Sequence, residues 1–92
     1  MIRVELPQAL CSDAEQNSSV VIDGSVTTVG DALSMLGRSS PAALDRIMDE
    51  RGSVRRHVNV FVNGENIRFL RGLDTPAPKD ATILVLAAVS GG

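Results

Sequence analysis

The chain has 92 residues, of which 43% are hydrophobic, and this length accommodates one small globular domain. Its nine basic and eleven acidic residues leave a net charge of -2, which argues against a nucleic-acid-binding protein. Lys79 is the single lysine, so the chain lacks a polybasic segment for a membrane surface. A lone cysteine, Cys11, excludes an internal disulfide, and no apolar run approaches the ~20 residues that span a bilayer. We therefore expect a cytoplasmic protein that binds neither nucleic acid nor membrane.

The first third of the chain predicts two strands and a helix. Apolar and charged residues alternate over 2–6, and a second apolar run covers 20–22, so the two segments are expected to pair as a hairpin. A helix is expected to begin after Thr28, a good N-cap residue, with Asp31 three positions later. Gly37 is expected to end this helix. The residues at helical spacing that predict its buried face are Val29, Ala32, Leu33 and Leu36.

A second, short helix is expected to begin at Ser40-Pro41, because proline suits the first helical turn, and to end at Gly52. Its apolar stripe is predicted as Leu44, Ile47 and Met48. The alternation over 57–63 predicts a strand, with Val58, Val60 and Val62 on one face, followed by a tight turn at Asn63-Gly64.

The last part of the chain predicts a short return strand, a loop and a central strand. Ile67 and Phe69 indicate the return strand, and the glycine and prolines of 71–80 indicate the loop. The segment 82–88 is apolar on both faces, as expected of a strand in the middle of a sheet.

This element order predicts an α+β fold that resembles the ubiquitin-like β-grasp. We expect a mixed sheet of four to five strands, with the last strand parallel to the first, and one main helix plus a short second helix on one face. Residues 1–92 are expected to form a single domain with a flexible C-terminal tail over 89–92.

Two glycines, Gly91 and Gly92, stand at the C-terminal end, directly after the strand predicted to be central. A frayed tail is the simplest interpretation. The alternative is acyl activation, in which the terminal carboxylate becomes an acyl-adenylate and a sulfur nucleophile then attacks its carbonyl carbon. Glycine suits that chemistry, because it has no side chain to clash in a partner's narrow channel.

The chain resembles the sulfur-carrier proteins of the MoaD/ThiS/CysO type along nearly its whole length. The most specific matches are Thr28-Val29-Gly30-Asp31-Ala32-Leu33, the stretch 57–69, and the ending Val89-Ser90-Gly91-Gly92. The resemblance implies the β-grasp fold and a carrier that is a protein co-substrate rather than an enzyme. It also implies that an E1-like adenylyltransferase of the MoeB/ThiF type activates the terminal glycine, which sulfur transfer converts to a thiocarboxylate.

The resemblance assigns roles to particular residues. Gly92 would carry the adenylate and then the sulfur, while the other tail residues and an apolar surface would contact the partner: Gly91, Ser90, Val89, Leu86, Ile67, Phe61. One departure from the family is Ala87-Ala88, where many relatives have a proline before the ending, so the tail is expected to be less stiff. No cofactor is expected to bind stably, since ATP and the sulfide source would be used by the activating enzyme.

Three alternatives remain open for the role of the activated terminus. The insert over 38–56 favours the cysteine-synthesis carriers, for which a cysteine synthase would accept the sulfur and a metalloprotease would release the product. The small subunit of molybdopterin synthase, acting with the large subunit, is the second alternative, and a ubiquitin-like protein modifier is the third.

Three remaining features favour structural rather than chemical roles. Cys11 has no partner cysteine and is more typical of a small hydrophobe than of a reactive thiol. No cysteine, histidine or carboxylate stands at metal-ligand spacing from His57, so no metal site is expected. Arg51, Arg55, Arg56 and His57 favour a solvated loop over a docking patch for an acidic partner.

Overall fold

The computed structural model describes residues 1–6, 18–23 and 25–87. The predicted tail 89–92 and Cys11 lie outside this part of the chain. The elements in chain order are β1 (Ile2–Leu6), β2 (Ser18–Ile22), α1 (Val29–Ser39), α2 (Pro41–Ile47), β3 (Val58–Val62), β4 (Glu65–Asn66), the 3₁₀ turns η2 (Ile67–Phe69) and η3 (Gly72–Asp74), and β5 (Thr82–Ala87). Neither described helix has the length and apolar character that a membrane crossing requires.

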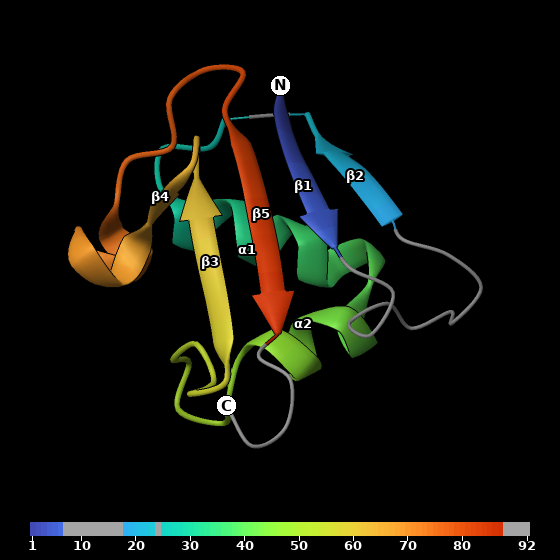
Figure 1. Cartoon of the computed structure of the whole chain (residues 1–92). Coiled ribbons are helices and arrows are strands. Elements are labelled where there is room, and N and C mark those ends of the chain that lie inside the picture. Colours follow the sequence, from blue (N-terminus) through green and yellow to red (C-terminus); the bar gives the residue numbers. More distant parts are fainter. Residues whose placement is uncertain (7–17, 24, 88–92) are drawn as a thin grey trace.

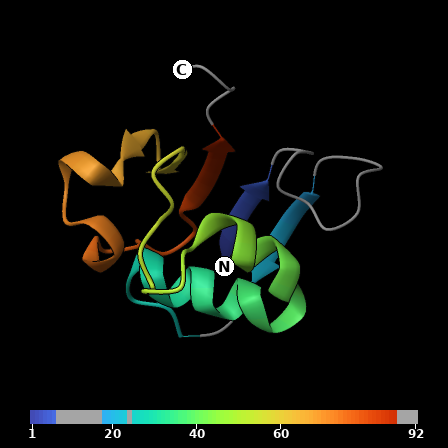
Figure 2. The ribbon, with the colours of Figure 1, turned by 90° about the horizontal axis from the view of Figure 1, so that it is seen from below.

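The strands form one mixed sheet in the order β2-β1-β5-β3-β4, so the last strand is the central one (Figure 1). β5 runs parallel to β1 and antiparallel to β3, and β1 pairs with β2 as the expected antiparallel hairpin. Both helices pack on one face of the sheet and leave the other face uncovered (Figure 2). The predicted α+β arrangement is therefore confirmed, with five strands.

The core lies between the sheet and the helices, and the buried hydrophobic side chains among the described residues are all aliphatic, since neither phenylalanine is buried. Each of β1, β3 and β5 alternates between buried and more exposed residues, as a half-buried strand must. The inward side chains are Ile2, Val4, Leu6, Val58, Val60, Val62, Ile83 and Val85. α1 covers them with the four residues predicted from its spacing, Val29, Ala32, Leu33 and Leu36.

Both helices end elsewhere than the sequence predicted. α1 continues past Gly37 to Ser39, and the glycine serves packing rather than termination. A Cβ on Gly37 would lie 2.3 Å from the Leu44 side chain of α2, so the absent side chain lets the helices approach. α2 ends at Ile47, and Gly52 lies beyond it with a positive φ of 81°.

A short return strand is present, but its predicted position at Ile67 and Phe69 is wrong. β4 covers only Glu65–Asn66, and Ile67–Phe69 is a 3₁₀ turn. The Asn66 side chain accepts a hydrogen bond of 3.0 Å from the Arg68 N–H, which caps that turn. A second turn, η3, lies within the predicted loop 71–80.

The N-terminus of α1 is a complete capping box, as Thr28 and Asp31 predicted. The Thr28 hydroxyl accepts from the Asp31 N–H at 3.1 Å, and the Asp31 carboxylate accepts from the Thr27 hydroxyl at 2.7 Å. These hydrogen bonds, that of Thr27 foremost, lower the pKa of Asp31. The resulting stabilisation is complete above the pKa of an unfolded aspartate and is lost as the pH falls through the lowered value.

We predict that Thr28→Ala lowers the free energy of unfolding by about 1 kcal/mol, because it leaves the Asp31 N–H without its acceptor. Thr28→Ser keeps a hydroxyl in the same place and should stay within about 0.5 kcal/mol of the wild type. Urea unfolding followed by circular dichroism measures both variants. Equal losses for alanine and serine would show that the threonine methyl group, not the cap, is what matters.

Candidate functional site

The site is organised around β5, the strand that leads toward the C-terminal glycines. Hydrogen bonds fix its beginning: the Asn63 N–H donates to the Thr82 carbonyl at 2.9 Å, and the Thr82 N–H donates to the Asn63 side-chain oxygen at 3.0 Å. At its other end Ala87 lies opposite Val58 of β3. β1 therefore pairs with the first half of the strand, as far as Leu84, and β3 pairs with it as far as Ala87, the last residue that the structure describes.

The uncovered face of the sheet carries an apolar surface beside this strand. Phe61 lies opposite Leu84, and Leu86, which is 41% exposed, follows two residues later on the same face. These three side chains line a shallow hollow of about 530 Å³ together with polar residues, among them Glu5 and Thr82. We call Phe61, Leu84 and Leu86 the sheet-face surface.

The structure brings together two of the predicted contact residues, Phe61 and Leu86, and adds Leu84, which the sequence analysis missed. Leu84 and Leu86 have the same parity in β5, so period-two alternation alone would have placed them on one face. The apolar character of both faces of this segment concealed that distinction.

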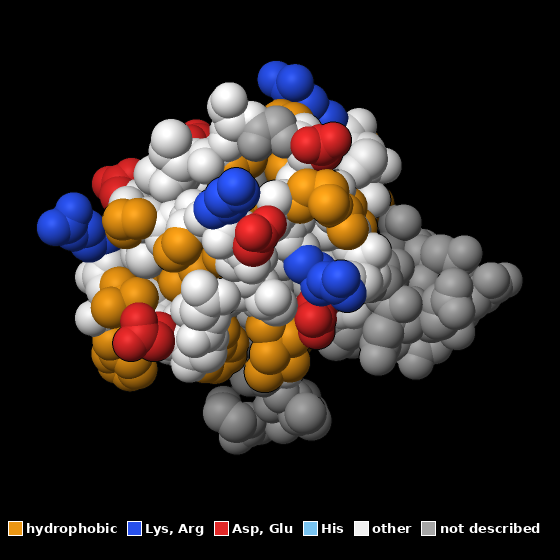
Figure 3. Space-filling view, turned by 90° about the horizontal axis from the view of Figure 1, so that it is seen from above, with side chains coloured by type: hydrophobic (Ala, Val, Ile, Leu, Met, Phe, Trp, Pro, Cys, Tyr) orange, Lys and Arg blue, Asp and Glu red, His pale blue; other side chains and the backbone are white. Residues whose placement is uncertain are grey.

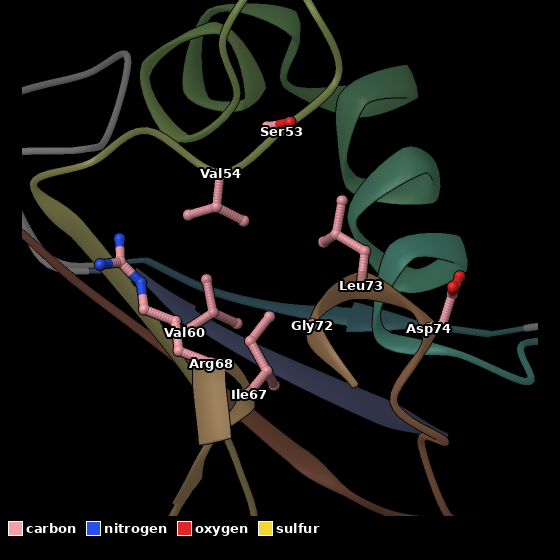
Figure 4. A pocket seen from close by; sticks show the side chains of 8 residues that line it. All are labelled: Ser53, Val54, Val60, Ile67, Arg68, Gly72, Leu73 and Asp74. Carbon is pink, nitrogen blue, oxygen red and sulfur yellow. The ribbon is translucent and has the colours of Figure 1, made fainter. Parts of the chain in front are cut away.

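Ile67 does not belong to this surface, and its predicted place there is wrong. Its side chain is only 2% exposed, and it faces a hollow of about 320 Å³ near Val54, Val60 and Leu73 (Figure 4). The 3₁₀ turn that replaces the expected strand directs Ile67 into the core. Its contribution is to packing beneath the 3₁₀ turns.

Arg68 stabilises the segment that precedes β3, another feature that sequence reasoning missed. Its Nη2 atom lies within hydrogen-bond distance of three carbonyl oxygens, those of Arg55 (3.1 Å), Arg56 (2.9 Å) and Val58 (2.8 Å). Because Val58 pairs with Ala87, the guanidinium also supports the end of β5. No spacing in the sequence indicates this contact, which joins residues ten to thirteen positions apart.

The basic cluster predicted after α2 lies in an exposed loop, and one of its side chains, that of Arg55, forms a hydrogen bond within the protein. Arg55 donates from Nε to the Asp45 carbonyl at 3.0 Å, whereas Arg51, Arg56 and His57 are exposed. The loop is shaped by Asp49, whose carboxylate accepts the Ser53 N–H, a contact that heads the causes lowering its pKa.

The residues with the most direct predicted roles lie outside the part that the structure describes. They are Val89, Ser90, Gly91 and Gly92. Their assignment therefore stays a prediction, as do the flexible tail and the discounted role of Cys11.

Comparison with known proteins places this geometry in a family. The model of the ThiS family matches residues 7–92. The chain belongs to the ThiS family. A relative named sulfur carrier protein CysO, from Mycobacterium tuberculosis, is 32% identical over 93 aligned positions, which cover 99% of this chain and 98% of the relative.

Solved structures agree with this membership in the ThiS family and confirm the β-grasp fold. The CysO of Amycolatopsis orientalis, solved in complex with BexX, superposes with a TM-score of 0.83 at 29% identity and covers 100% of both chains. Small archaeal modifier protein SAMP1 from Haloferax volcanii superposes with a TM-score of 0.73 at 29% identity, covering 99% of this chain and 98% of that one. The ThiS-family fold thus occurs in proteins named as sulfur carriers and as modifiers.

Shortening a side chain should affect stability differently on the two faces of β5. Ile83 is 0% exposed, so Ile83→Ala is expected to lower the free energy of unfolding by about 2–5 kcal/mol, and Ile83→Val by about 0.5–1.5 kcal/mol. Leu86→Ala on the uncovered face should cost less than about 1 kcal/mol. Urea unfolding of the three variants tests this order, and a Leu86→Ala loss as large as that of Ile83→Ala would contradict it.

Proposed function

We propose that the chain is a sulfur carrier whose Gly92 carboxylate is adenylated by an E1-like enzyme and converted to a thiocarboxylate. The observation that carries the proposal is the full-length match to a protein named sulfur carrier protein CysO. The carrier is a co-substrate: the activating enzyme binds ATP and performs the chemistry, and the carrier contributes the reacting carboxyl group.

The chemistry proceeds in two balanced steps. A carboxylate oxygen of Gly92 attacks the α-phosphorus of ATP, which forms the acyl-adenylate and releases pyrophosphate. Hydrosulfide then attacks the acyl carbon; alternatively an enzyme persulfide attacks it and forms an acyl disulfide, whose S–S bond a thiol breaks to release the thiocarboxylate. The carbon–sulfur bond forms as the carbon–oxygen bond to AMP breaks, and AMP leaves with the bonding electron pair. The thiocarboxylic acid then loses its proton.

The geometry of β5 supports this role. A reacting carbonyl carbon must be held close to its attacker, since misplacement by ~1 Å costs about a hundredfold in rate. The pairing of β5 with β1 as far as Leu84 and with β3 as far as Ala87 limits movement of the chain that leads to the terminus. The sheet-face surface lies beside that strand and offers the activating enzyme an apolar docking area.

Cysteine synthesis is the pathway we propose for the sulfur. The CysO match favours it, with a cysteine synthase as acceptor and a metalloprotease as the enzyme that releases the product. The Amycolatopsis orientalis CysO, solved with BexX, supports a carrier that works by assembling with a protein partner. The likeness to SAMP1 favours protein modification through Gly92 as the second candidate function.

We predict that incubation with the activating enzyme, ATP and sulfide replaces one terminal oxygen of Gly92 by sulfur. Intact-mass spectrometry should detect the corresponding mass increase, and fragmentation should place it on the C-terminal residue. Cys11→Ser should load equally well, because the proposed chemistry uses only the terminal carboxyl. A mass increase located on Cys11 would contradict the proposal.

Two tail variants serve as controls for that assay. Deletion of Gly92 and addition of one residue after it both displace the terminus by about 3.3–3.6 Å and should abolish loading. Every described core residue lies before the tail, so both variants should melt as the wild type does. Full loading of the extended chain would refute the terminal-carboxyl mechanism. Conjugates on a denaturing gel, with no thiocarboxylate, would favour the modifier.

The sheet-face surface gives a separate prediction for docking. Leu86→Ala should raise the KM of the activating enzyme for the carrier by about tenfold, because it removes apolar contact from the centre of the surface. Val21→Ala is the matched control: Val21 is 49% exposed and lies opposite Arg3 on the edge strand β2, outside the hollow. An equal rise in KM for both variants would contradict a docking site centred on β5.

A further inference from the structure

A second exposed apolar surface lies at the β4 side of the molecule, and its hollow shares one lining residue, Asn63, with the hollow of the sheet-face surface. Two adjacent large apolar side chains are exposed there: Phe69 is 85% exposed and Leu70 is 44% exposed. Phe69 is one of only two phenylalanines in the chain. The 3₁₀ turn directs Ile67 inward and thereby leaves Phe69 outside. An aromatic side chain so fully in water is a common mark of an interaction site.

A hollow of about 600 Å³ is lined in part by Leu70, the residue that follows Phe69. Val62, Leu70, Pro76 and Pro78 give it apolar walls, and Glu65 and Arg71 are its charged residues. Figure 3 shows apolar side chains interspersed with acidic and basic ones on this side of the molecule. We call Phe69 together with these six lining residues the β4 patch.

The backbone of the β4 patch is held in place before any partner arrives. The Leu70 N–H donates to the Ile67 carbonyl at 3.0 Å, and the Arg71 N–H donates to the Thr75 hydroxyl at 3.0 Å. Thr75 itself is only 4% exposed. Binding at this surface therefore requires little ordering of the chain, which lowers its entropic cost.

The β4 patch holds pairs of features that are complementary in shape and in charge. It has one protruding aromatic residue and one apolar hollow, together with one exposed acid, Glu65, and one exposed base, Arg71. Within the described residues, neither charged side chain forms an ion pair. In a two-fold dimer every contact between two different residues occurs twice, so a surface that holds both members of each matching pair can bind its own copy.

We propose that the β4 patch binds the β4 patch of a second copy of this chain. Phe69 of each copy occupies the hollow of the other, and Arg71 faces Glu65 of the partner subunit, so that the charge pair occurs twice. A surface of this size produces a weak, reversible dimer rather than an obligate one.

The dimer leaves the proposed sulfur chemistry accessible. Val62, a wall of the hollow, lies opposite Ile83 near the beginning of β5, whereas Ala87 at the other end of that strand lies opposite Val58. The β4 patch therefore lies at the end of the sheet where β5 begins, and not at the end from which the chain leads to Gly92. The dimer leaves that second end of β5 uncovered.

Sedimentation equilibrium of the full chain tests the proposal. The average mass of the wild type should rise toward twice the monomer mass as its concentration increases to roughly 1 mM. Phe69→Ser should remain monomeric over this range, while Val21→Ser, which changes an exposed apolar residue elsewhere, should dimerise as the wild type does. A monomeric wild type at the highest concentration, or a Phe69→Ser variant that still dimerises, would overturn the proposal.

A charge exchange tests the two-fold geometry itself. Glu65→Arg alone and Arg71→Glu alone should each weaken the dimer by about tenfold, because like charges then face each other. An equimolar mixture of the two variants should regain wild-type affinity, since every arginine now faces a glutamate. The double variant Glu65→Arg/Arg71→Glu should regain it too. Failure of both to recover would refute the paired contact, and an unchanged sulfur-loading rate in all variants separates this result from that of the carrier proposal.

Discussion

The position of β5 between β1 and β3 is the constraint on which the rest of the structure depends. The strand that leads to the C-terminus has a hydrogen-bonded neighbour on each side, one parallel and one antiparallel. A parallel neighbour requires a long crossover connection between the first and last strands, and the helices, β3 and the 3₁₀ turns supply it. The central strand of the sheet is thus the segment that leads to the C-terminal residues.

The two faces of that strand contribute unequally to the stability of the fold. Ile83 and Val85 point into an aliphatic core, whereas Leu84 and Leu86 point to the uncovered side with Phe61. A substitution on the inward face therefore acts mainly on folding, whereas one on the outward face costs little stability. The apolar docking area that we propose on the outward face thus does not weaken the core.

The predictions from sequence succeeded where local chemistry and periodicity agree. The capping box at Thr28 and the alternation of Val58, Val60 and Val62 each specify both an element and its buried face. The central place of β5 followed from its apolar character on both sides.

The predictions failed where a side-chain contact outweighs the local pattern. Ile67 and Phe69 have the spacing of a strand, yet the Asn66 cap favours a 3₁₀ turn and sends the two side chains in different directions. Gly37 does not end its helix, and its lack of a side chain leaves room for Leu44 of α2. The Arg68 contacts join segments that only the folded chain brings together, so no local pattern announces them.

Amide hydrogen exchange measured by NMR tests the central claim, that β5 is the most firmly held strand, most directly. The amides of Ile83 and Val85 should exchange only through global unfolding, with an opening free energy equal to that from urea denaturation, whereas amides of β4 should open at lower free energy. A β5 that opens locally, well below the global free energy of unfolding, would contradict the view that the fold holds this strand firmly to position the C-terminus.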